Sequence, residues 1–142
     1  MDFSGDIKKL QDNFLFIRRA GGWSTRDFGD LIGVTNQTIS NIENKKTELT
    51  KTQYLATLAA LEFELSKRNP DDILHLVLGI VFGNKELSVD QRNEAIKFID
   101  GIKKEKGLQS TKANDGLKKV IGGAGIVAVS ISIIGFILKR IK

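Results

Sequence analysis

The stretch from Gly33 to Lys46, GVTNQTISNIENKK, restricts strongly what this part of the chain can form. At about 100° per residue, Ile39 and Ile42 fall on one face of a helix, close to Val34 from the preceding turn. Thr35 is a suitable N-cap, so we expect a helix over about 35–44. Its apolar face must pack inward, which leaves uncharged polar side chains outside: Asn36, Gln37, Ser40, Asn41 and Asn44.

Helical spacing of apolar residues recurs along the first hundred residues, and no stretch shows the alternation of a strand. A first helix should run from Ile7 to the glycines at 21 and 22, and a second from Thr25 to Ile32 with Ser24 as its N-cap. Three further helices are expected at 52–65, 73–82 and 88–106. In the helix at 52–65, the residues expected to face inward are Tyr54, Leu55, Leu58 and Leu61. The predicted fold class is all-α.

Composition argues against several kinds of site. The chain has no Cys and one His, so neither a thiolate nor a His-rich metal site can form. No phosphate-binding glycine loop and no nucleophile–base pair is recognisable, so we expect no catalytic residue, cofactor, metal or small-molecule substrate. The net charge is +5, but residues 1–65 hold eight Lys and Arg against nine Asp and Glu. This near-neutral part should bind an anionic partner only modestly as a monomer.

The last segment differs in kind from the rest. Val120 to Leu138 contains no charged residue, and this length can cross a hydrocarbon layer of about 30 Å. Basic residues flank it at 118–119 and 139–140, as expected for head-group anchors. Nothing near the N-terminus resembles an export signal, so we expect a single-pass membrane protein whose folded part faces the cytoplasm.

These observations predict four regions along the chain. They are a helical domain at 1–66, a helical extension at 67–106, a polar linker at 107–117, and a membrane anchor with a short tail at 118–142.

The stretch WSTRDFGDLIGVTNQTISNIENKK, within about residues 7–65, resembles the Cro/repressor-type (XRE-like) helix-turn-helix family. This resemblance implies a five-helix DNA-binding domain. It depends on a set of apolar, turn and polar positions: Phe28, Leu31, Ile32, Gly33, Val34, Thr38, Ile39, Ser40, Ile42, Glu43 and Asn44.

The resemblance also implies roles for individual residues. Bases in the major groove would be contacted by Asn36, Gln37, Ser40 and Asn41, and phosphates by Thr25, Thr38 and Lys46. Arg18 would pair with Glu43 and brace the recognition helix from behind. Three positions depart from the family pattern, which commonly has Gln at Thr25, Ala at Gly29 and Gly at Lys45.

The function expected from these features is a membrane-anchored transcriptional regulator of bacterial or phage type that binds double-stranded DNA. A homodimer would engage two half-sites. Either the small residues of the membrane segment (Gly125, Ala128, Ser132 and Gly135) or the apolar helix at 73–82 could mediate it.

Two alternatives remain at this point. One is a membrane-tethered scaffold similar to RodZ-type cell-shape proteins, which would expose apolar or aromatic side chains on the domain. The other is a soluble repressor whose last segment is buried in an oligomer.

Overall fold

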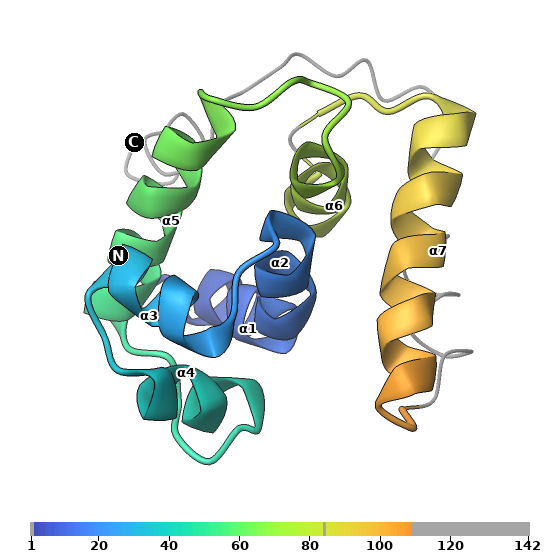
Figure 1. The fold of residues 1–142 in the computed structure, drawn as a ribbon. Helices are drawn as coiled ribbons and strands as arrows, with labels where there is room; N and C mark the ends of the chain where they lie inside the picture. Colours follow the sequence, from blue (N-terminus) through green and yellow to red (C-terminus); the bar gives the residue numbers. More distant parts are fainter. Residues whose placement is uncertain (1, 84, 109–142) are drawn as a thin grey trace. The chain divides into compact units, whose positions relative to one another are not determined.

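The computed structural model of the chain describes residues 2–83 and 85–108, and these residues form helices and no strand. The all-α prediction is confirmed for this part of the chain. None of the described helices is long and apolar enough to span a membrane, and the expected anchor at 120–138 lies outside the described residues. In chain order (Figure 1) the helices are α1 Ser4–Asp12, α2 Phe14–Gly21, α3 Thr25–Ile32, α4 Asn36–Glu43, α5 Lys51–Leu65, α6 Ile73–Phe82 and α7 Val89–Glu105.

The described residues divide into two compact units after Arg68. The first unit contains α1 to α5, and the second contains α6 and α7.

Side-chain caps and left-handed glycines define the helix boundaries in the first unit. The hydroxyl of Ser24 accepts a hydrogen bond from the Asp27 N–H at 3.0 Å, which caps α3 as predicted. Thr50 forms a capping box with Gln53 at the start of α5. The glycines that follow α2 and α3, Gly22 and Gly33, have φ angles of 78° and 88°, which other residues adopt only with strain.

The prediction of a single helix from Ile7 to the glycines at 21 and 22 was wrong, because the helix is interrupted at Asn13. Asn13 has φ −111° and ψ 8°, and its side-chain amide donates to the Lys9 carbonyl at 2.8 Å. An Asn side chain that bonds a nearby carbonyl competes with the helical hydrogen-bond pattern. The apolar spacing continues through this break, so α1 and α2 resemble one helix in the sequence.

The core of the first unit is built around aromatic side chains. The Phe14 and Phe28 rings lie 5.0 Å apart, and Trp23 stacks on Phe28 at 5.2 Å. From α5, the buried side chains include Tyr54, Leu58 and Leu61. The expectation that Leu55 also faces inward was wrong, since 36% of it is exposed. Leu55 follows Tyr54 by one residue and is therefore turned about 100° away from the buried face.

The second unit is a pair of helices, α6 and α7, that pack on each other. The Asp72 carboxylate accepts from the Leu74 N–H and caps α6, while a capping box of Ser88 and Gln91 starts α7. The Gln91 side chain also donates to Asp71 Oδ1 at 2.9 Å, which joins the start of α7 to the residues before α6. From α7, the buried apolar side chains are Ala95, Ile99 and Ile102.

Candidate nucleic-acid interface

The backbone of α3 at Gly29 lies very close to the backbone of the turn that leads into α4. The N–H groups of Gly33 and Val34 both donate to the Gly29 carbonyl at 2.8 Å. A Cβ atom placed on Gly29 would lie 2.6 Å from the Val34 carbonyl oxygen, too short for any real contact. Gly29 is therefore required by this turn, and the Ala that is common in the resembled family would force α3 and α4 apart.

Helix α4 has one buried and one outward face. Ile39 and Ile42 are 0% and 1% exposed. Among the residues expected to contact bases, Asn36 and Gln37 are exposed, whereas Ser40 and Asn41 are half-buried. Two further contacts lie along the outward face: Gln37 Nε2 donates to Asn41 Oδ1 at 3.0 Å, and the Asn44 amide donates to the Ser40 hydroxyl at 3.3 Å. The polar row is thus accessible and partly ordered by its own hydrogen bonds.

Arg18 and Glu43 form an ion pair that joins α2 to the end of α4. Arg18 Nε donates to Glu43 Oε2 at 2.6 Å and Arg18 Nη2 donates to Glu43 Oε1 at 3.2 Å, while Nη1 donates to the Trp23 carbonyl at 2.9 Å. Each side chain of the pair is only 10% exposed. A two-point fork of this kind fixes orientation as well as distance. It therefore holds α4 at one angle relative to α2, the bracing that the resemblance implied.

Residues 16–67 match a family model described as helix-turn-helix. The matched range spans α2 to α5 and includes the α3–turn–α4 arrangement. No curated protein and no solved structure matches the chain. Residues 16–67 of the first unit are therefore similar to a helix-turn-helix domain.

The residues expected to contact phosphate lie in the first unit, at the start of α3, in the first turn of α4 and in the loop after α4. Thr25 is the first residue of α3 and is half-buried. Thr38 is also half-buried, and its hydroxyl lies 2.9 Å from that of Thr35, the N-cap of α4. Lys46 is exposed in the loop after α4, where its N–H donates to the Asn41 carbonyl at 2.9 Å.

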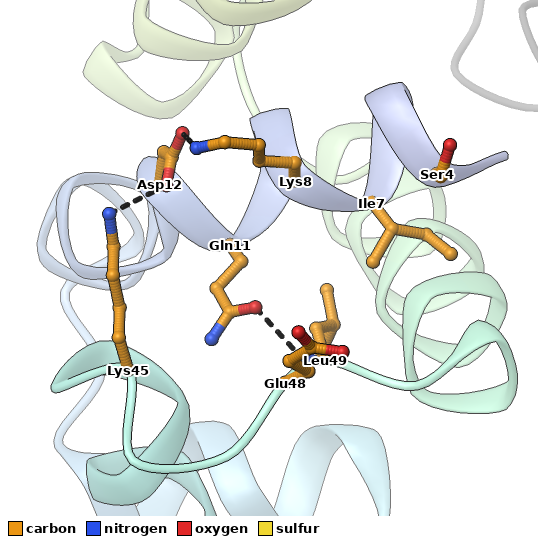
Figure 2. Close-up of a pocket in the computed structure, with 8 residues that line it drawn as sticks. All are labelled: Ser4, Ile7, Lys8, Gln11, Asp12, Lys45, Glu48 and Leu49. Atoms are coloured by element: carbon orange, nitrogen blue, oxygen red, sulfur yellow. Dashed lines mark hydrogen bonds and ion pairs between the residues drawn. The ribbon is translucent and has the colours of Figure 1, made fainter.

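Sequence reasoning missed Gln11, which fixes the loop after α4 to α1. Gln11 Nε2 donates to the carbonyls of Ile42 at 3.0 Å and Thr47 at 2.8 Å, and Gln11 Oε1 accepts from the Leu49 N–H at 3.0 Å. Figure 2 shows Gln11 pointing from α1 toward this loop, in a cavity of about 490 Å³. The three partners are 31 to 38 residues away in the chain, so no local pattern could have indicated them.

Lys45, which stands where the resembled family commonly has Gly, adopts the left-handed backbone conformation. Its φ is 58°, in the left-handed region that glycine adopts most readily. Lys45 Nζ lies 2.7 Å from Asp12 Oδ1, and Lys8 Nζ lies 2.8 Å from Asp12 Oδ2 (Figure 2). Burial alone would raise the pKa of Asp12, but hydrogen bonds and attraction from Lys45 and Lys8 outweigh it and hold that pKa below its ordinary value. Asp12 thus neutralises a lysine directly beside Lys46.

The described residues hold no group of three or more His, Asp or Glu side chains that could bind a metal ion. The single histidine, His75, is half-buried in α6 of the second unit.

Proposed function

We propose that the helix-turn-helix domain binds double-stranded DNA sequence-specifically, with α4 in the major groove. The observation that carries this proposal is the division of α4 into a buried apolar face and an accessible row of amides and a hydroxyl. Asn and Gln can form two hydrogen bonds with adenine, and Ser can donate or accept. In this proposal, Asn36, Gln37, Ser40 and Asn41 contact bases.

The rest of the interface has few positive charges. Thr25, Thr38 and Lys46 would contact phosphates, whereas the ion pair with Asp12 reduces the contribution of Lys45. Because phosphate contacts supply much of the affinity for DNA, one copy should bind weakly. A homodimer that engages two half-sites about one helical turn apart would compensate.

The full chain, in this proposal, is a transcriptional regulator held at the membrane by residues 120–138, with the helix-turn-helix domain in the cytoplasm. The support is the uncharged run from Val120 to Leu138 and the basic residues on both sides of it. No catalytic step is assigned to the chain. Membrane fractionation tests the anchor, since recovery of the protein in the soluble fraction without detergent would exclude it.

Selection of preferred sequences from a random DNA library by the full-length protein tests the DNA proposal. Asn36→Ala and Gln37→Ala should each reduce base discrimination by about 1–3 kcal/mol at one position of the site. Asn93→Ala, the same change at an exposed position of α7, is the matched control. If neither α4 variant alters the selected sequence, α4 does not read DNA.

The salt dependence of binding separates phosphate contacts from base contacts. Lys46→Ala should weaken all sequences alike and reduce the slope of log affinity against log salt by about 1. A change in base preference with an unchanged slope would contradict the role proposed for Lys46.

One observation favours a second candidate function, the membrane-tethered scaffold. Phe63 in α5 is 61% exposed, with Lys67 Nζ 4.1 Å from its ring centre. An exposed aromatic side chain on this domain is what a protein-binding role would require. Two results together would establish the scaffold instead. The full-length protein would show no preference among DNA sequences, and Phe63→Ala would lose binding to a membrane-associated protein.

A further inference from the structure

Gly101 lies inside α7, where nothing in the described part of the chain requires a glycine. Gly in a helix interior costs about 1 kcal/mol relative to Ala. A Cβ atom at Gly101 would meet no atom within 4 Å, whereas one at Gly29 would meet the backbone. The missing side chain therefore leaves open space beside α7 and serves no packing among the described residues.

That open space is part of a shallow, widely open groove in the second unit with a volume of about 600 Å³. Positions 94, 98, 101 and 105 are spaced by four, three and four residues, so they form one seam along α7. Phe98 is half-buried and supplies an apolar surface, and charged residues surround it. The groove is lined by Ile73 of α6 and by Glu94, Lys97, Phe98, Gly101, Ile102 and Glu105 of α7.

We propose that a second copy of this chain docks its own α7 in this groove, antiparallel, with the two-fold axis at Gly101. The charges around Gly101 are self-complementary, because Lys97 lies four residues before it and Glu105 four residues after it. In an antiparallel pair centred there, each Lys97 faces Glu105 of the other copy. The contact is isologous, so the favourable pair forms twice.

Helix geometry and charge together select this arrangement. Lys97, Gly101 and Glu105 form a row of four-residue steps, and two such rows lie along each other when helices cross at about 50°. Glycine at the crossing point lets the axes approach to about 8 Å. A register that is centred between Phe98 and Gly101 would instead place Glu94 opposite Glu105, and a parallel pair would place each glutamate opposite its own copy.

Cross-linking of the full-length protein tests the register directly, since the chain contains no cysteine. Lys97→Cys and Glu105→Cys are made in separately tagged copies, which are mixed and treated with a short bismaleimide. The mixture should give a cross-linked heterodimer several-fold more abundantly than either variant alone. Val89→Cys, exposed at the start of α7 and turned about 120° around the helix from Gly101, is the control and should not cross-link with either. The proposal is overturned if no heterodimer forms, or if each variant cross-links with itself as well as with the other. If residues 109–142 covered the groove instead of a second copy, no heterodimer would form.

A charge exchange tests the same contact without cysteines. Lys97→Glu and Glu105→Lys should each weaken self-association by roughly fivefold in sedimentation experiments, and the double variant should restore it. Gly101→Leu should abolish self-association while leaving the helix at least as stable, because Leu is the better helix former. Unchanged self-association in Gly101→Leu, or no recovery in the double exchange, overturns the proposal. These measurements contain no DNA, so their outcome does not depend on the function proposed for α4.

Discussion

Replacing Gln11 with alanine should lower the free energy of unfolding by about 2 kcal/mol and weaken DNA binding without changing base preference. The side chain forms three hydrogen bonds with backbone groups of Ile42, Thr47 and Leu49. Each such bond contributes about 1 kcal/mol net. The bond to the exposed Thr47 carbonyl counts for less, because water replaces it when the glutamine is removed.

Urea unfolding followed by tryptophan fluorescence measures the stability of the first unit, to which Gln11 belongs. Trp23 is the single tryptophan and stacks on Phe28 in the core of the first unit, so its emission reports unfolding there. Gln37→Ala is the matched control, since it makes the same change at an exposed residue whose side chain bonds only a neighbour on α4. Gln11→Glu keeps the acceptor for the Leu49 N–H but turns an oxygen toward two carbonyls, so it should destabilise at least as much as alanine.

The DNA effect follows from the loop that Gln11 holds, because that loop carries Lys46. Gln11→Ala should therefore lower the affinity for preferred and random sequences by the same factor. If its unfolding free energy lies within about 0.5 kcal/mol of that of Gln37→Ala, the three hydrogen bonds do not hold the loop and the reasoning fails.

Three further changes test the first unit by the same fluorescence measurement. Glu43→Leu should lower the free energy of unfolding by about 3 kcal/mol, because it leaves Arg18 buried without its carboxylate partner. Adding Arg18→Met should recover most of that loss. If the effects of the two substitutions simply add, this reasoning is contradicted. Gly29→Ala should destabilise by about 1–3 kcal/mol despite the better helix propensity of Ala, because its Cβ overlaps the Val34 carbonyl; a more stable variant would refute the close contact. The lowered pKa of Asp12 adds stability that is present above its unfolded pKa and is lost as pH falls through its folded pKa. Asp12→Asn should thus be less stable than the parent at neutral pH, with the difference disappearing below about pH 4; a constant difference at all pH values would contradict it.

The helix boundaries were predictable because their determinants are local. Ser24 and Thr35 accept from N–H groups only three residues ahead, and Gly33 ends α3 in the conformation that glycine favours. Apolar spacing likewise identified Ile39 and Ile42 as the buried face of α4. Such signals need no knowledge of the rest of the fold.

The remaining features depend on contacts that no local pattern contains. The break at Asn13 arises from a side-chain bond that competes with a helix whose apolar spacing is uninterrupted. Gln11 acts through backbone groups more than thirty residues away, and Lys45 keeps a glycine-like turn although its side chain gives no indication of it. The requirement for glycine at position 29 could not be predicted either, because Gly and Ala are both small. Only the position of the Val34 carbonyl oxygen excludes a Cβ atom there.

The division of α4 has a practical consequence for protein engineering. Ile39 and Ile42 satisfy the packing needs of the helix, and the amides at 36, 37 and 41 take no part in the core. A combinatorial library at these three positions should consist almost entirely of folded members, because surface changes seldom cost more than about 0.5 kcal/mol. New target preferences could then be sought without redesign of the protein interior.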